Sequence, residues 1–373
     1  MNKTKLLIVA TCIMLILIGC NNLNKTSVIN SEEKKFDGYD FEQSLYYDYN
    51  SKIKFRVSPM VQATYLAVEM LYEETGFTNY KYSRENVKDS VENFKEYSDH
   101  YFLKLLSSMI KEGFSYDAIP KSLYYFNEDF RMREDIVFDG EVLRRAGGKE
   151  NLVDFIHQLK EFRMDSDFEL YFKDNKGMYL DIMGKGQDMV TTYKVAETIE
   201  EFYGVPLENP VVTITPFTTN AYGTSISRKD GSIEMLPTLG VYEDKENFIA
   251  LLIHEFSHGY VNPLIAEHLD VVEKTKDLYE PIEESMVKHA YPTWEISVIE
   301  HIVRANTAIM IKNIFGESAY KYELIINRDR GFKYIDDVVE SLTYYTEHRD
   351  VYPTFEDYYP VIMNVFESLS DTN

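Results

Sequence analysis

The sequence predicts a predominantly helical α+β protein: a helical N-terminal region, a short antiparallel sheet at about 211–241, a helix carrying the motif HEFSH, and a helical C-terminal part. Three observations predict it. Apolar residues recur at spacings of three and four through most of the chain, as in amphipathic helices. After Pro210 the pattern changes to alternating and β-branched residues. The helical spacing then returns after Asp244.

Residues 1–19 are predicted to be a lipoprotein signal peptide. Two lysines precede an apolar run at 6–18, which is too short to be a stable membrane span. The ending LIGC resembles the bacterial lipobox, whose cysteine receives a diacylglycerol thioether. We therefore expect a lipid anchor at Cys20, which would hold the chain at the bacterial cell envelope, facing outside the cytoplasm. An ordinary signal peptide with a chance cysteine is the alternative.

The rest of the chain divides by composition into three parts. Residues 20–38 are polar and aperiodic, which predicts a flexible stalk. Residues 39–205 are the predicted helical N-terminal region. Residues 206–373 hold the predicted sheet and the HEFSH helix, and form the candidate functional region.

Charge and cysteine content exclude several classes of function. The chain has 39 Lys and Arg against 62 Asp and Glu, a formal net charge of −23. This balance argues against nucleic acid as a partner. The two cysteines are Cys12, inside the signal, and Cys20. The mature chain therefore has no disulfide and no thiolate metal site, so a metal must be held by His, Asp or Glu.

Caps and breakers place the main elements. Ser58-Pro59 starts a helix, and the run 189–203 is a helix that Gly204 ends. Three strands follow, in VVTITPF, AYGTSIS and SIEMLPTLGVY, with a turn at 229–231 between the last two. Asp244 then caps a helix that is expected to end before Asn262-Pro263. The clearest later helix is 294–315.

The motif H-E-x-x-H lies in the helix that Asp244 is predicted to cap. His254 and His258 are four residues apart, so both imidazoles project from one helical face. Glu255 holds the position of the general base in metalloproteases with this motif. The helix is apolar on nearly every face, and burying these polar groups unpaired is costly. We therefore predict that Zn²⁺ pairs the imidazoles; a chance match with core carbonyls as their partners is the alternative.

A catalytic zinc site needs a third protein ligand. No histidine follows at the spacing H-E-x-x-H-x-x-G-x-x-H, which leaves a downstream acid. The candidates are Asp277, Glu280, Glu283, Glu284 and Glu300. The first four lie in a charged stretch typical of a solvated helix start. Glu300 lies inside the apolar helix 294–315 and is the predicted ligand, with Arg304 beside it. A Glu300–Arg304 ion pair without metal is the alternative.

Two further groups are candidates for contact with substrate. Asn220, Ala221 and Tyr222 lie one strand before the motif helix, where strand addition would pair them with a substrate backbone. An ordinary strand start is the alternative. Tyr345 and His348, in YYTEHRD, are candidates for stabilising an oxyanion.

The stretches HEFSHGYVNP, EHIVRA, RVSPMVQATYLAVEML and NFKEYSDHYFLKLLSSMI together resemble a bacterial lipoprotein family of unknown function that is placed among zincin-like metallopeptidases. The resemblance runs from about 55 to 365, and HEFSHGYVNP is its most specific part. It implies a zincin-like core of the gluzincin type, with His254, His258 and Glu300 as zinc ligands and Glu255 as the base.

The sequence therefore predicts a zinc-dependent metallopeptidase that hydrolyses peptide bonds outside the cytoplasm, with a peptide or protein as its substrate and a lipid anchor in the membrane. A non-catalytic surface lipoprotein that binds peptide or glycan, with a degenerate or structural metal site, is the alternative. An intact glutamate after the first histidine favours the enzyme, since a structural site has no use for a base.

Overall fold

The computed structural model describes residues 40–47, 51–72, 85–208, 210–241 and 244–372. The segment Phe41–Asn373 forms one compact unit. The predicted signal peptide, Cys20 and the predicted stalk lie outside the described residues. Among the helices of the described residues, none combines the length and the apolar character that a membrane crossing requires.

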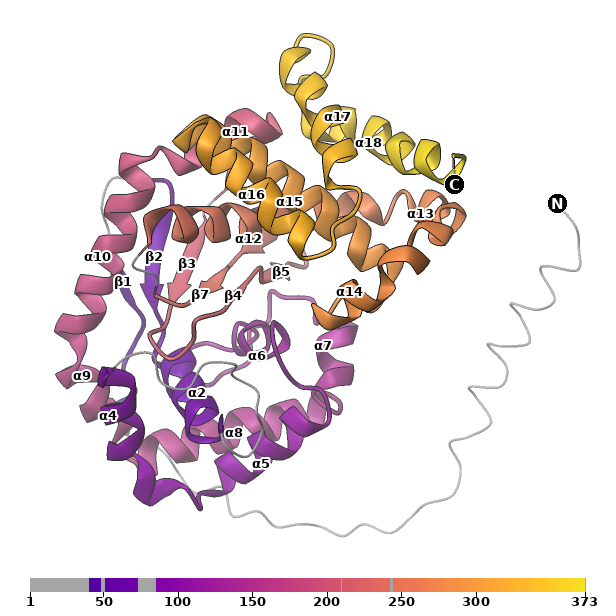
Figure 1. The fold of residues 1–373 in the computed structure, drawn as a ribbon. Helices are drawn as coiled ribbons and strands as arrows, with labels where there is room; N and C mark the ends of the chain where they lie inside the picture. Colours follow the sequence, from indigo (N-terminus) through magenta and orange to yellow (C-terminus); the bar gives the residue numbers. More distant parts are fainter. Residues whose placement is uncertain (1–39, 48–50, 73–84, 209, 242–243, 373) are drawn as a thin grey trace, which may run out of the picture. The chain divides into compact units, whose positions relative to one another are not determined.

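A mixed five-stranded sheet lies among the helices, in the order β1-β2-β3-β7-β4 (Figure 1). Its strands are β1 (Leu45–Tyr47), β2 (Lys54–Val57), β3 (Val211–Ile214), β7 (Thr238–Leu239) and β4 (Ala221–Tyr222). The pairs β2–β3 and β3–β7 are parallel, whereas β1–β2 and β7–β4 are antiparallel. A separate antiparallel pair joins β5 (Ser225–Ser227) to β6 (Ile233–Met235).

The predominantly helical α+β class is confirmed, but the prediction of an antiparallel sheet confined to about 211–241 is wrong in two respects. The sheet is mixed, and two of its strands come from residues 45–57. Both errors have one cause. The β2–β3 pairing joins segments more than 150 residues apart, and a parallel pair of strands leaves no local turn in the sequence. The predicted turn at 229–231 is present, with Gly231 at a φ of +88° between β5 and β6.

Helices between β2 and β3 make up most of the N-terminal half: α2 (Pro59–Met70), α4 (Glu85–Asn93), α5 (Tyr101–Lys111), α6 (Ala118–Leu123), α7 (Gly140–Arg145), α8 (Lys149–Asp165), α9 (Phe168–Asp174), α10 (Lys176–Thr192) and α11 (Val195–Tyr203). The side chain of Ser58 caps α2 by accepting a hydrogen bond from Val61 N–H. Helix α10 packs against β1 and β2, and α2 packs against α4, α8 and α9.

The single helix predicted at 189–203 is in fact the end of α10 followed by α11. Lys194 separates them with a left-handed backbone, at a φ of +49°. Periodicity did not reveal this break because apolar residues continue across it and no glycine or proline marks it. Gly204 does end α11, in the predicted left-handed conformation.

The C-terminal half is helical: α12 (Lys245–Ile265), α13 (Leu269–Lys274), α14 (Glu283–Lys288), α15 (Trp294–Phe315), α16 (Glu317–Asp329), α17 (Ile335–Glu347) and α18 (Phe355–Ser370), with short 3₁₀ turns at Lys276–Leu278 and Glu280–Ile282. Helix α12 contacts α15 and also the strands β4 and β6. Helix α15 in turn contacts α11, α16 and α17, so both helices lie deep in the fold.

Helix α12 begins as predicted, with the side chain of Asp244 accepting hydrogen bonds from the N–H groups of Glu246 and Asn247. It does not end before Asn262-Pro263 but continues to Ile265. Proline removes one hydrogen bond from a helix and crowds the carbonyl four residues earlier. Here that residue is Gly259, and only the last turn follows Pro263, so the disruption is confined to the helix end.

Candidate metal centre

The two histidines of the motif face each other on α12. The Nε2 atoms of His254 and His258 are 3.3 Å apart, and the ring centroids are 4.9 Å apart at an interplanar angle of 82°. This is the face-sharing that a spacing of four residues imposes on a helix. The neighbouring side chains Ile253, Phe256 and Val261 are buried, which holds this turn of α12 in the core.

Glu300 reaches the same point from α15. Its Oε1 lies 3.3 Å from His258 Nε2, and its Oε2 lies 3.7 Å from His254 Nε2. The three residues form a group whose potential ligand atoms all lie within 4.8 Å of one another. Because α12 and α15 pack directly on each other, two helices deliver three ligand side chains to one place. Two imidazoles and one carboxylate are a donor set found in catalytic zinc sites.

Burial and charge set the protonation of these groups. Burial lowers the pKa of His254 well below its ordinary value, so this ring is neutral and carries a free lone pair. Burial also lowers the pKa of His258, but Glu300 raises it more strongly, to about 9. Burial raises the pKa of Glu300, yet Arg304 and the two histidines hold it well below its ordinary range. Glu300 is therefore an anion, and a positive charge belongs beside it.

The residues present fit a divalent metal. Glu300 Oε2 is buried and lies 3.1 Å from Arg304 Nε, but the described residues donate no well-oriented hydrogen bond to it. Two Nε2 atoms turned toward each other have at most one proton to share between them. His258 Nδ1 lies 3.2 Å from Asn262 Oδ1, so an Nδ1–H donates to this oxygen, and a metal would displace the proton that the neighbouring Glu300 holds on Nε2. A divalent cation at this point would pair with the two Nε2 atoms and with the buried carboxylate of Glu300.

Glu255 lies beside the cluster and against strand β4. The side chain is buried, and burial raises its pKa to about 7. The backbone of Gly223, directly after β4, lies against this carboxylate and lowers its pKa. A Cβ atom at position 223 would lie 2.7 Å from Glu255 Oε2 and 3.2 Å from His258 Cδ2. Position 223 therefore requires glycine, because only a bare backbone can approach the carboxylate this closely.

A second layer of side chains surrounds Glu300. Arg304 Nε lies 3.1 Å from Glu300 Oε2. Arg304 Nη2 donates to the hydroxyl of Tyr291 at 2.9 Å, and Nη1 donates to Asn327 Oδ1 at 3.1 Å. The guanidinium also lies over the ring of Phe332, 4.5 Å from its centroid. Groups from α15, α16 and the loop before α15 thus fix the direction of the Glu300 carboxylate.

Comparison with known proteins places this geometry in a family. Residues 56–365 match the model of a family described as "Domain of unknown function (DUF4932)". The chain belongs to the DUF4932 family. The matched range includes the three candidate ligands and the candidate base: His254, His258, Glu300 and Glu255. No curated protein and no solved structure matches the chain. The DUF4932 description states no activity.

The other candidate ligands and the two oxyanion candidates of this DUF4932 protein do not belong to the His254–His258–Glu300 group. The four acids other than Glu300 are exposed, and they lie outside the metal cluster: Asp277, Glu280, Glu283 and Glu284. Tyr345 is buried and donates to Phe202 O at 2.6 Å. His348 Nδ1 hydrogen-bonds Tyr344 O, and its ring stacks on Tyr344. The hydrogen bonds of Tyr345 and His348 therefore involve α11 and α17, and their role at an oxyanion stays a prediction.

The strand candidates lie beside the motif helix. Ala221 and Tyr222 form β4, which is one edge of the five-stranded sheet and contacts α12. The ring of Tyr222 is buried and stacks on Tyr65, and Asn220 Nδ2 donates to the Tyr222 hydroxyl at 3.1 Å. Any contact of β4 with a substrate would therefore involve its backbone, and this contact also stays a prediction.

Sequence reasoning missed two residues around the cluster, Tyr291 and Asn327. It placed Gly223 with Asn220–Tyr222 in the candidate substrate strand but did not foresee its contact with Glu255. Gly223 had a weak signal, a glycine directly after a strand that precedes the motif helix. Tyr291 and Asn327 had none, because they reach Arg304 from segments 13 and 23 residues away. A chain with 30 tyrosines offers no way to single one out from the sequence.

Proposed function

We propose that this protein is a zinc-dependent metallopeptidase of the gluzincin type. The observation that carries the proposal is the convergence of His254, His258 and Glu300 on one point, with the buried carboxylate of Glu255 beside it. Zinc is the metal that two imidazoles and a carboxylate favour when hydrolysis is the reaction. A site that only stabilised the fold would not need Glu255 next to its ligands.

Each residue has a defined part in this reaction. His254, His258 and Glu300 would hold the ion, which supplies Lewis-acid polarisation of the scissile carbonyl and lowers the pKa of a water molecule. Glu255 accepts a proton from the attacking water at its carboxylate and passes it to the leaving nitrogen. Arg304 keeps Glu300 ionised and oriented toward the histidines.

A peptide as substrate is supported by the strand beside the site. Strand β4 ends the sheet, and its continuation at Gly223 lies against the carboxylate of Glu255. An extended peptide that added to this edge would run past the general base.

The test is a peptide-library digestion by the purified mature chain, analysed by mass spectrometry. We expect cleavage that a chelator abolishes and Zn²⁺ restores. Glu255→Gln should keep the zinc and lose at least about 100-fold in rate, the lower end of what a general base contributes. Glu246→Gln is the matched control, because Glu246 is an exposed acid on the same helix. Zinc binding without any cleavage would favour the non-catalytic lipoprotein instead.

We also propose that the protein acts outside the cytoplasm, held to a membrane at Cys20. The support is the N-terminal sequence alone, with its short apolar run and its LIGC ending. Radiolabelled palmitate should enter the full-length chain, and Cys20→Ala should prevent labelling and release the protein from the membrane fraction. An unlabelled wild-type chain in the soluble fraction would contradict the anchor.

A further inference from the structure

A cavity of about 780 Å³ lies beside the sheet. Its walls come from β1 and β2, from the loop after α6, and from the β5–β6 hairpin, with Tyr46, Arg56, Tyr124 and Glu234 among the lining residues. The described residues that line it include none of the four residues of the metal centre. Its size falls within the range of sites for small molecules.

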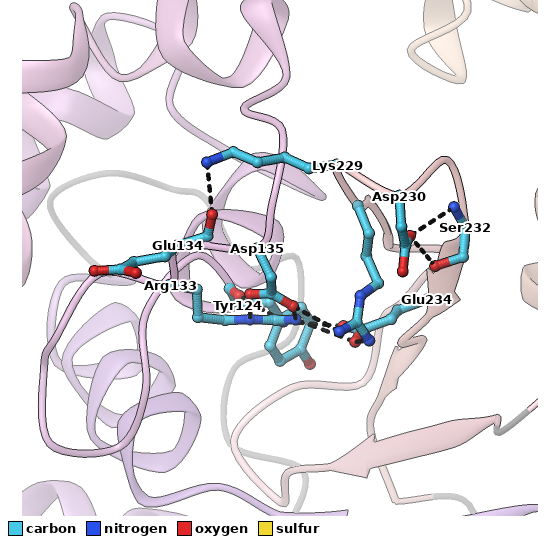
Figure 2. A network of polar contacts seen from close by, with 9 residues as sticks. Tyr124, Arg133, Glu134, Asp135, Lys229, Asp230, Ser232 and Glu234 are labelled. Carbon is cyan, nitrogen blue, oxygen red and sulfur yellow. Dashed lines mark hydrogen bonds and ion pairs between the residues drawn. The ribbon is translucent and has the colours of Figure 1, made fainter.

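One wall of the cavity is a closed network of charges (Figure 2). Arg133 lies 2.9 Å from Asp135 Oδ2 through Nη2 and 2.9 Å from Glu234 Oε2 through Nη1. Arg228 makes ion pairs of 2.9 Å and 2.7 Å with the same two carboxylates. Two arginines therefore neutralise two acids. These four side chains together carry no net charge.

Arg56 is different, because it is a cation in the cavity wall without an ion pair. Its Nε and Nη2 both donate to one neutral acceptor, Thr213 Oγ1, at 3.1 and 2.8 Å. Its guanidinium lies over the ring of Tyr124, 4.8 Å from the centroid. Among the described residues, no carboxylate oxygen lies within 4.0 Å of it. A guanidinium has five N–H donors, so most of them remain for another acceptor.

Two acids of the cavity lining, Glu128 and Asp129, have other partners. Glu128 accepts hydrogen bonds from Ser44 Oγ at 2.6 Å and from Met60 N–H at 3.2 Å. Asp129 accepts from Arg131 Nε at 2.6 Å. Glu128 attracts Arg56 through space, but it forms no ion pair with it. Arg56 is half-buried, and its neighbours are the hydroxyls of Thr213 and Tyr46 and not a carboxylate. A bound anion would satisfy such a guanidinium.

We propose that this cavity binds a small ligand through a single carboxylate group, which Arg56 receives in a bidentate manner. The planar fork of arginine matches the two oxygens of a carboxylate. The acids in the lining and the net charge of −23 disfavour a doubly charged phosphate more strongly than a monoanion. The same acids accept hydrogen bonds from hydroxyl or amide N–H groups elsewhere on the ligand. A peptide C-terminus and a sugar acid both have this chemistry.

The proposal is independent of the metal centre. Strand β6 separates the two: Glu234 lines the cavity, whereas the side chain of the next residue, Met235, faces Gly259 on α12. Among the described residues that line the cavity, none belongs to α12, and Met235 is not one of them. Ligand binding in the cavity should therefore survive removal of the metal.

Isothermal titration calorimetry of the mature chain tests this, before and after treatment with a chelator. The probes are N-acetyl-trialanine, its C-terminal amide, gluconate and inorganic phosphate. We expect a carboxylate probe to bind equally well in both states and the amide not to bind. The peptide acid and gluconate arms distinguish the two sources of the carboxylate. Tighter binding of phosphate, binding that the chelator abolishes, or no binding of either carboxylate would each overturn the proposal.

Variants and labelling then locate the ligand. Arg56→Gln should weaken binding at least about tenfold and Arg56→Lys less, since lysine keeps the charge but loses the fork. Arg144→Gln is the control, because Arg144 is an exposed arginine paired with Glu141. If Arg56→Gln fails to fold, wild-type protein suffices: the ligand should slow phenylglyoxal modification of Arg56 but not of Arg144. Equal modification rates with and without ligand would place the ligand elsewhere.

Discussion

Arg304 Nε lies 3.1 Å from Oε2 of Glu300, one turn earlier on α15. The pairing of Glu300 with Arg304 and its approach to the two histidines are therefore present together, and they are not alternatives. One carboxylate oxygen faces His258, and the other lies between Arg304 and His254. An arginine in this position keeps a buried ligand ionised and restricts its rotamer, as residues around metal ligands commonly do.

Arg304→Ala should weaken zinc binding by about 10- to 100-fold. The variant leaves Glu300 with fewer restraints and raises the cost of its buried charge. Competition of the protein with a chromophoric chelator measures the affinity. Arg304→Lys should recover part of the loss. Arg328→Ala is the control, because Arg328 is a half-exposed arginine on α16 that pairs with Asp336. Unchanged affinity in Arg304→Ala would remove Arg304 from the site.

Glu300→Ala should lose zinc more completely than Arg304→Ala, by more than about 100-fold in affinity, because it deletes one of the three ligands. Elemental analysis of the purified variant gives the metal content directly. Glu295→Ala, an exposed acid in the first turn of the same helix, should keep the wild-type content. Full occupancy in Glu300→Ala would show that another group supplies the third ligand.

Gly223→Ala should disturb the general base most strongly, and it also crowds the ring of His258, whose Cδ2 would lie 3.2 Å from the added methyl group. The added methyl group would lie 2.7 Å from Glu255 Oε2 and 3.0 Å from its backbone oxygen, so β4 or α12 must move. We expect a loss of about 1–3 kcal/mol in unfolding free energy and a fall in peptide hydrolysis. Gly177→Ala, at an exposed helical glycine with no neighbouring atom within 4 Å, should cost nothing. Wild-type hydrolysis in Gly223→Ala would contradict the close approach.

The core of the site could be predicted because its geometry is local. A spacing of four residues on a helix brings two imidazoles together whatever the rest of the chain does. Glu300 could be predicted because a charged residue inside an apolar helix requires a partner. Its partners His254 and His258, 46 and 42 residues earlier in the chain, were inferred from the chemistry of zinc sites and not from a pattern.

The remaining features depend on contacts between distant segments. Phe55 pairs with Val212 where β2 and β3 run parallel. Nothing in the sequence of either strand indicates that the other is its partner. Gly223 matters only because α12 packs against β4, and Tyr291 matters only because α15 turns Arg304 toward it. The sequence does not distinguish Arg56 from other charged residues in short strands. Its place in the cavity wall is visible only in the structure.

Arg163→Ala should destabilise the N-terminal half by about 3–5 kcal/mol, the cost of breaking a buried ion pair. Arg163 is fully buried and donates to Glu169 at 2.7 and 2.8 Å. Its removal would leave the buried carboxylate of Glu169 without its ion-pair partner. Urea unfolding measures the change. Because an apolar pair can replace a buried ion pair, Arg163→Met with Glu169→Leu should recover most of it. Arg144→Ala, at an exposed pair with Glu141, should leave the midpoint unchanged. An equally stable Arg163→Ala variant would show that Glu169 finds another partner or takes up a proton when the arginine is gone.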